Sequence, residues 1–254
     1  MNNNRFCSHL CVFGQDRWLD KHISMISQYV EKIYLSFSEI PWNYNPNARQ
    51  QFKNSFNPDS LKDHKYYNKI EFIKGTWDLD EQQRNSCLDA AKRDGFDYMF
   101  IIDCDEFYKY NDIEKMITNI NNNPDYEYYT TPWLSFWKDY QHIVINENND
   151  PIIGYPEVCI NLHKDQKFNR CRRPSGSKCY QLDSLCYHMS NVLTDIECWT
   201  KINTWGHSHQ FSVSQWYSEK WLNWNENTLN LHPVNPSVWK QAVRHNYELP
   251  QILK

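Results

Sequence analysis

Long apolar runs are missing from this sequence of 254 residues, and with them any candidate for a membrane span. The first apolar stretch, Phe6–Phe13, is interrupted by Ser8 and His9 and does not have the continuous apolar region of a signal peptide. No other segment approaches the roughly 20 apolar residues that cross a bilayer. We therefore expect a soluble chain with no membrane span.

Paired cysteine motifs are absent too. The nine cysteines are an odd number, and they are scattered without a C-x-x-C pair or the spacing of a zinc site, as is typical of thiols in a reducing compartment. Only Asn235-Pro-Ser has the N-x-[ST] spacing of a glycosylation acceptor, and its proline blocks it. Both features predict a cytoplasmic protein.

An excess of either charge is also lacking, since 27 Lys and Arg face 31 Asp and Glu, for a net charge of -4. The total therefore does not indicate a polyanionic partner, although a local basic groove is compatible with it. The chain shows no internal repeat and no linker that would divide it. Its length suits one domain with a substantial core, residues 1–254.

The most informative stretch is Tyr98–Tyr108, where five large apolar residues are followed at once by Asp103, Asp105 and Glu106. The apolar run indicates a strand that is covered on both faces. In an open α/β sheet, ligands bind outside the carboxyl ends of the strands. Carboxylates two residues apart in an extended chain share a face, and such hard oxygen ligands favour Mg²⁺ or Mn²⁺.

The sequence Asp103-Cys-Asp105 resembles the D-x-D motif with which GT-A-fold glycosyltransferases hold a divalent ion against a nucleotide sugar. The surrounding block, Glu81-Gln-Gln-Arg-Asn85, Gly95-Phe-Asp-Tyr98 and Asp103–Phe107, is similar to the family-2-like branch of these enzymes. The alternative is an acidic turn that caps the next helix. The resemblance implies a single α/β domain of GT-A (Rossmann-like) type, with a mostly parallel central sheet and a helical, aromatic-rich C-terminal part.

The resemblance also implies that residues 1–110 form the nucleotide-sugar-binding half and residues 111–254 the acceptor-side half. Strands are predicted at 6–13, 32–37, 69–74 and 98–102, with helices at 16–29 and 81–94. In this fold the first two strand ends cradle the nucleotide, so Gly14, Asp16 and Ser36 become candidate contacts. Ordinary loop chemistry is the alternative. The polar stretch 41–67 is predicted to be a long connection near the site.

Arg84 is predicted to lie close to Asp103. The stretch Asp78–Glu81 is typical of a capping box, and Arg84, Leu88 and Ala91 fall on one face of the helix that follows. The start of that helix lies at the carboxyl edge of the sheet. Arg84 then binds a diphosphate, holds the carboxylates in place, or forms a merely structural ion pair.

His188 is the second candidate ligand. It precedes a capping box, Thr194 to Glu197, and a helix that is closed by Gly206. This arrangement is similar to the His-x-Ser, helix, Gly-His pattern of the same branch. The resemblance implies that His188 completes a metal shell with Asp103 and Asp105, with His207 as its competitor, and imidazole suits Mn²⁺.

Several further elements are expected. A helix follows Asp112, and the aromatic stretch 126–137, broken by Pro132, indicates an edge strand. The basic segment 164–178 predicts either a lid over a diphosphate or anionic acceptor or a solvated loop. Helices are predicted from Ser214 and Pro236. The tryptophans in this region either form a platform that binds the acceptor or, for the most part, are packed in the core.

Together these features predict a metal-dependent transferase that moves a sugar from a UDP- or GDP-sugar to a glycan or other hydroxyl acceptor. Glu106, Asp139 and Glu157 are candidates for the base that an inverting enzyme needs. One alternative is a nucleotidyltransferase, although the stretch 13–16 has only one glycine. The other is a non-catalytic carbohydrate-binding module. A modified nucleic acid acceptor would contact segment 164–178.

Overall fold

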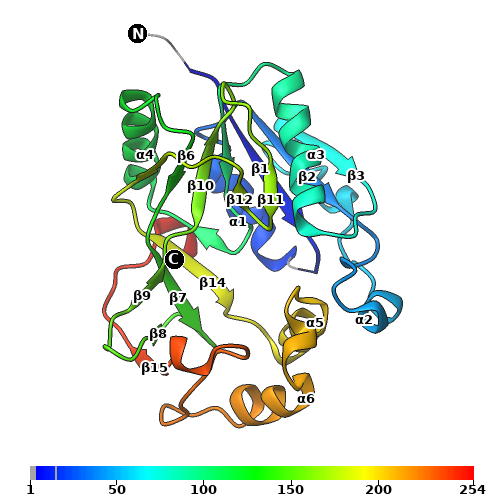
Figure 1. The fold of residues 1–254 in the computed structure, drawn as a ribbon, viewed down its shortest axis with the longest axis vertical. Helices are drawn as coiled ribbons and strands as arrows, with labels where there is room; N and C mark the ends of the chain where they lie inside the picture. Colours follow the sequence, from blue (N-terminus) through cyan, green and yellow to red (C-terminus); the bar gives the residue numbers. More distant parts are fainter. Residues whose placement is uncertain (1–3, 15) are drawn as a thin grey trace.

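The computed structural model describes residues 4–14 and 16–254 and builds two larger β-sheets (Figure 1). The first has seven strands in the order β13-β6-β10-β4-β1-β2-β3. Its strands are β1 (Phe6–Val12), β2 (Lys32–Phe37), β3 (Ile70–Lys74), β4 (Tyr98–Ile101), β6 (Tyr128–Thr130), β10 (Glu157–Asn161) and β13 (Cys179–Gln181). The strands β3, β2, β1 and β4 run parallel to one another, and β10 is antiparallel to both β4 and β6. The predicted mixed α/β fold with a largely parallel central sheet is confirmed.

Helices cover both faces of this sheet because its strands are apolar on both sides. The helices α1 (Asp16–Ile26) and α4 (Tyr110–Asn122) pack on the face that carries Phe6, Leu10 and Phe100. The helix α3 (Asp80–Arg93) packs on the opposite face, against Cys7 and Ile101. Strand alternation also turns His9 of β1 towards α3. The first turn of α3 consequently lies where β1 and β4 end.

The second sheet has the order β15-β8-β7-β14-β5, with β9 paired to β7. Its strands are β5 (Glu106–Phe107), β7 (Trp133–Trp137), β8 (His142–Ile145), β9 (Ile152–Gly154), β14 (Cys186–Asn191) and β15 (Gln241–Arg244). The prediction of one edge strand over 126–137 is wrong. The chain forms β6 in the first sheet and β7 inside the second, because Pro132 cannot donate to a ladder and breaks the stretch between them.

The C-terminal third packs against the second sheet (Figure 1). It contains α5 (Asp195–Thr204) and α6 (Val213–Trp216), which continues as a π-helical stretch at Tyr217–Leu222. Trp137, Trp216 and Trp221 are buried together in this region, so these tryptophans are packing. The helix predicted from Pro236 is wrong, because the chain makes a single 3-10 turn, Pro236–Val238, and then enters β15.

The remaining elements are short. The connection 41–67 contains α2 (Pro46–Gln51) and a 3-10 turn, Pro58–Leu61, with another at Tyr67–Lys69. The basic segment forms the hairpin β11 (Phe168–Arg170) and β12 (Arg173–Pro174), and a final 3-10 turn spans Gln251–Leu253. A short 3-10 turn at Ser208–Gln210 follows α5.

The capping box of α3 does not use the predicted pair Asp78 and Glu81. Instead the Gln82 side-chain oxygen accepts hydrogen bonds from the backbone N–H groups of Asp78 (2.9 Å) and Leu79 (3.2 Å). The residue that caps the start of the helix is therefore Gln82, one position after Glu81. The box that opens α5 is confirmed, because Thr194 and Glu197 bond each other's backbone N–H groups.

Within the described ranges, no helix combines the length and the apolar character needed to cross a membrane.

Candidate active site

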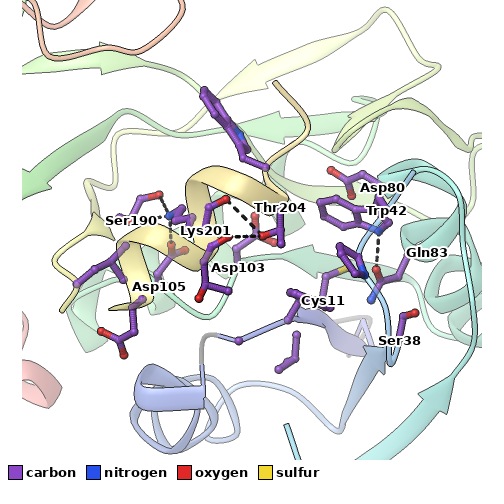
Figure 2. Close-up of a pocket in the computed structure, with 18 of the residues that line it drawn as sticks. Cys11, Ser38, Trp42, Asp80, Gln83, Asp103, Asp105, Ser190, Lys201 and Thr204 are labelled. Atoms are coloured by element: carbon purple, nitrogen blue, oxygen red, sulfur yellow. Dashed lines mark hydrogen bonds and ion pairs between the residues drawn. The ribbon is translucent and has the colours of Figure 1, made fainter. Parts of the chain in front are cut away.

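A cavity of about 250 Å³ lies where β1 and β4 end, between α3 and α5 (Figure 2). Its lining residues come from segments 11–14, 38–42, 80–84, 103–105 and 188–205. The location agrees with the rule that open α/β sheets bind ligands outside the carboxyl ends of their strands. Both halves of the chain therefore contribute to one cavity.

Arg84 occupies the buried wall on the α3 side. Its Nε donates to Asp80 Oδ1 at 2.6 Å, and its two terminal nitrogens donate to the Asp103 carboxylate at 3.0 and 3.2 Å. The predicted proximity of Arg84 to Asp103 is confirmed. This two-point pairing fixes the orientation of Asp103 because the guanidinium is planar.

A second guanidinium, from Arg172, approaches the same carboxylate from the basic segment. Arg172 donates to Asp103 Oδ2 at 3.4 Å and to Glu106 at 2.5 and 3.1 Å. It also donates to the backbone oxygens of Ile101 and Glu157 at 2.5 and 2.6 Å. The Arg172 guanidinium is thus fully engaged in internal hydrogen bonds. The other basic residues of the segment that are exposed are Lys167, Arg170, Arg173 and Lys178.

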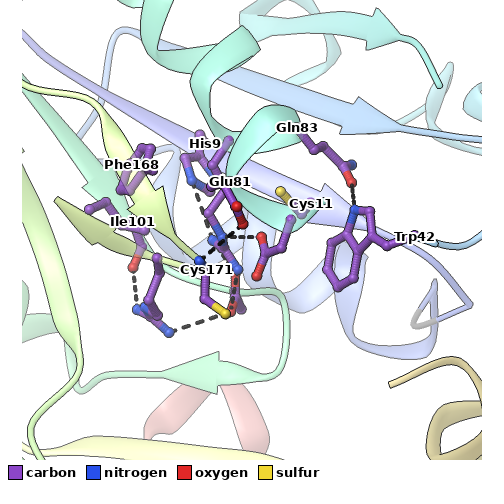
Figure 3. Close-up of polar contacts among 12 residues, drawn as sticks. His9, Cys11, Trp42, Glu81, Gln83, Ile101, Phe168 and Cys171 are labelled. Carbon is purple, nitrogen blue, oxygen red and sulfur yellow. Dashed lines mark hydrogen bonds and ion pairs between the residues drawn. The ribbon is translucent and has the colours of Figure 1, made fainter. Parts of the chain in front are cut away.

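Neighbouring contacts hold the hairpin that carries Arg172 onto α3 (Figure 3). The backbone N–H of Cys171 donates to Glu81 Oε2 at 3.3 Å. Phe168 is buried beside the His9 ring, and its backbone N–H donates to Asn85 at 2.8 Å. The segment predicted as either a lid or a solvated loop is therefore pinned at its centre.

The buried charges shift several pKa values. Burial opposes ionisation of Asp103, but Arg84 and Arg172 outweigh it and lower the pKa of this carboxyl. Burial, helped by Arg84, lowers the pKa of His9 to about 3. Burial raises the pKa of Glu106 to about 7, against the opposing pull of Arg172. The pair of arginines thus selects Asp103 as the permanently charged carboxylate.

Asp105 has a different environment on the α5 side (Figure 2). It is 4% exposed, with His188 Nε2 at 3.9 Å from Oδ1 and Lys201 Nζ at 3.6 Å from Oδ2. The His188 ring stacks on Trp133, with centroids 4.3 Å apart. Burial lowers the pKa of His188 to about 4. The imidazole is therefore neutral at pH 7, and its unprotonated ring nitrogen is able to bind a cation.

This geometry suits two of the three predicted metal ligands. Asp105 and His188 fit a divalent cation, because ligands about 2 Å from one ion lie within about 4 Å of each other. Asp103 is bound by two guanidinium groups instead, and the described residues contain no ready group of three or more His, Cys, Asp or Glu ligands. His207 lies beside Trp205 at a centroid distance of 4.9 Å, and the structure brings His188 to Asp105.

Two of the candidate nucleotide contacts are placed by the structure. Gly14 lines the cavity with a φ of 67°, which glycine adopts without strain. Ser36 is buried instead, and its hydroxyl donates to the Leu10 carbonyl at 3.2 Å. Ser38, two residues later at the end of the same predicted segment, lines the cavity. The side chain of Asp16 is outside the described part of the structure.

None of the three candidate bases is among the described residues that line the cavity. Glu106 is fully buried beneath Arg172. Asp139 lies in the second sheet, 2.9 Å from His142 Nδ1, and Glu157 begins β10. The lining carboxylates that the sequence did not suggest are Asp80, which pairs with Arg84, and Glu197, which forms an ion pair with Arg17 at 2.7 Å.

Trp42 and Lys201 were also missed. The Trp42 indole N–H donates to Gln83 Oε1 at 2.9 Å, which holds the 41–67 connection against α3. A lone tryptophan in a polar stretch without a period carries no signal for this contact. Lys201 follows Glu197 by four residues in α5, so helical spacing could have placed both on one face.

Comparisons with known proteins identify similar folds at low identity. No family model and no curated protein matches the chain. A 4-diphosphocytidyl-2C-methyl-D-erythritol synthase from Anaerococcus prevotii is 11% identical with a TM-score of 0.41, over 78% of this chain and 94% of that one. HddC from Yersinia pseudotuberculosis, complexed with GMP-PN, is 13% identical with a TM-score of 0.43, over 76% and 96%. A protein from Desulfovibrio desulfuricans, provisionally described as a nucleotide-diphospho-sugar transferase, is 11% identical with a TM-score of 0.42, over 80% and 90%. At this level of similarity, function must be argued from the site itself.

Proposed function

We propose that this chain is a glycosyltransferase that moves a sugar from a nucleoside diphosphate sugar to an acceptor hydroxyl. One observation carries the proposal: Asp105 is a buried carboxylate that faces both an imidazole and an ammonium group inside a cavity at the carboxyl ends of parallel strands. Such a cavity combines a cation-binding group with fixed positive charge. A diphosphate leaving group needs both.

The residues divide into two roles in this proposal. Asp105 and His188 would hold Mn²⁺ or Mg²⁺, which acts as a Lewis acid on the diphosphate when bound. Asp103 keeps its charge through Arg84 and Arg172, and its side chain is 28% exposed, so it can accept hydrogen bonds from ribose hydroxyls. Gly14, Ser38 and Trp42 surround the space that a nucleoside of UDP or GDP would fill.

The test is release of a nucleoside diphosphate from UDP- and GDP-sugars, with and without Mn²⁺. Release that depends on the metal and is lost in Asp105→Ala supports the proposal. Release of pyrophosphate from a nucleoside triphosphate would instead assign a nucleotidyltransferase. Binding of oligosaccharides with neither reaction would assign a carbohydrate-binding module.

A further inference from the structure

Lys201 provides a cation at the acidic end of the cavity. It lies in the last turn of α5, and its stem extends towards Asp105 (Figure 2). The Nζ donates to Ser190 Oγ at 2.5 Å and to the Ser190 carbonyl at 2.6 Å. The side chain is 23% exposed. The ammonium group is therefore anchored but still reachable from the cavity.

The anchoring leaves part of the ammonium available to a ligand. An ammonium group has three N–H donors. Ser190 accepts two of them, and Asp105 Oδ2, at 3.6 Å, is beyond hydrogen-bond distance. One donor therefore points at no protein acceptor within the described residues. An anionic oxygen that enters the cavity can take it.

The other positive charge of the cavity wall is already committed. Arg84 and Lys201 are the cations among the described residues that line the cavity. Arg84 is bound to Asp80 and Asp103 from a position that is 4% exposed. Lys201 is more exposed, and Asp105, with which it forms an ion pair at 3.6 Å, is beyond hydrogen-bond distance. The cavity thus presents Lys201 to an anion and keeps Arg84 for its own carboxylates.

We propose that Lys201 binds the diphosphate of the donor and stabilises it as the leaving group, a role that rests on the proposed glycosyltransferase function. When the bond between the anomeric carbon and the diphosphate oxygen breaks, its electron pair stays on that oxygen. The acceptor oxygen forms the new bond to the anomeric carbon, and its proton passes to a base and then to solvent. Lys201 keeps its own proton and offsets the negative charge that develops. Ser190 and Asp105 act as positioning residues for the ammonium group.

The experiment measures binding by calorimetry in EDTA and in Mn²⁺. The probes are UDP, GDP, the matching nucleosides and inorganic pyrophosphate. Lys201→Met should lose about tenfold to a hundredfold in affinity for the diphosphates, the range expected for a hydrogen bond to a charged group. Affinity for the nucleosides should not change. The loss should appear in EDTA as well as in Mn²⁺, because the lysine contact does not pass through the metal.

Three further variants sharpen the result. Lys115→Met is the matched control, since Lys115 is on α4 with a side chain that is 70% exposed, and it should bind every probe like the wild type. Lys201→Arg should recover part of the diphosphate affinity because it restores the charge. Ser190→Ala should give a smaller loss than Lys201→Met. This variant removes the hydroxyl that positions the ammonium group, but the ammonium group itself is still present. Thermal unfolding checks that each variant is folded.

The outcomes separate the two proposals. If the wild type binds UDP and GDP and Lys201→Met binds them equally tightly, the proposed role of Lys201 is overturned, while the proposed glycosyltransferase function is unaffected. Equal losses for nucleoside and diphosphate would also overturn it, since they indicate a structural effect on the whole cavity. A wild type that binds none of the probes in either condition would overturn both proposals.

Discussion

Asp103 and Asp105 are separated by one residue, yet their surroundings differ in almost every respect. Asp103 accepts hydrogen bonds from two guanidinium groups, at distances from 3.0 to 3.4 Å. Among the described residues no guanidinium pairs with Asp105, and its neighbours Lys201 Nζ and His188 Nε2 lie 3.6 and 3.9 Å away. The protein pairs Asp103 with arginine and leaves the Asp105 carboxylate without a partner of that kind among the described residues. The resemblance to a D-x-D motif treats the two positions as partners, but their contacts in the structure differ, and we propose separate tasks for them.

The supports of the two carboxylates differ as well. Arg84 lies in α3, which packs on the central sheet, and is itself buried. Lys201 lies in α5, which Glu197 links to Arg17 of α1 through a partly exposed ion pair. We therefore expect the Asp103 side to be the more rigid wall and the Asp105 side to be the wall that adjusts to a ligand. Of the four predictions that follow, three test this contrast and one tests the buried core beside it.

The largest effect is expected from Arg84→Met, which leaves the buried Asp80 without its arginine and leaves Asp103 with Arg172 alone. Removal of one member of a buried ion pair costs about 3–5 kcal/mol. Urea unfolding measures this loss. Arg93→Met is the control on the same helix, because Arg93 is 62% exposed and its ion pairs contribute less than about 1 kcal/mol. Similar losses in both variants would refute the rigid wall.

The next effect concerns activity rather than stability. Asp105→Ala should reduce sugar transfer by about a hundredfold or more, the scale of a lost electrostatic contact in a transition state. The free energy of unfolding should change little, since no hydrogen bond within 3.5 Å joins the carboxylate to the neighbouring His188 or Lys201. Asp165→Ala, at an exposed position, should retain full activity. Turnover of the Asp105 variant within threefold of the wild type would contradict the assignment.

The third prediction uses pH. His22 is fully buried in α1, and burial lowers its pKa to about 4, from about 6.5 in an unfolded chain. Between these values the unfolded chain binds a proton that the folded chain does not, so stability is complete above pH 6.5 and falls towards pH 4. His22→Leu removes this dependence. Relative to the wild type, its free energy of unfolding should improve by about 1–2 kcal/mol between pH 7 and pH 5. A difference that does not change with pH would show that His22 is not held neutral.

The smallest effect is expected from Arg17→Met. The Arg17 side chain is 37% exposed in its pair with Glu197, and exposed pairs contribute about 0.2–1 kcal/mol. Global stability should therefore fall by less than about 1 kcal/mol. Hydrogen exchange of α5 amides should nevertheless accelerate, while exchange in β1 and β4 stays unchanged. Equal acceleration in the central strands would show that α5 is not a separately adjustable wall.

Sequence reasoning worked where one local pattern determines the structure. The apolar run before Asp103 and the capping box of α5 appear as predicted. The helix predicted after Asp112 is α4, which begins two residues earlier, at Tyr110. Arg84 reached Asp103 because helix periodicity and the βαβ rule together fix the start of α3 at the sheet edge. These features depend on neighbours within one or two elements.

The errors come from contacts between distant segments. Arg172 follows Asp103 by 69 residues, and no periodicity relates the two. The stretch 126–137 divides between two sheets because its pairing partners, β10 and β14, are far along the chain. The candidate bases failed to reach the cavity for the same reason. Glu106 is next to Asp105 in sequence, but its side chain is directed to Arg172 instead.

The Trp42 indole is fixed at the cavity wall, which makes its fluorescence useful. The ring lines the cavity, and its N–H is tied to Gln83, whose amide in turn donates to the Ser36 carbonyl at 3.0 Å. An aromatic ring that is immobilised in this way changes its fluorescence when a guest replaces the water beside it. Subtracting the emission of a Trp42→Phe variant would remove the background from the other tryptophans. The chain thus carries an intrinsic optical reporter of occupancy, which requires neither a label nor turnover.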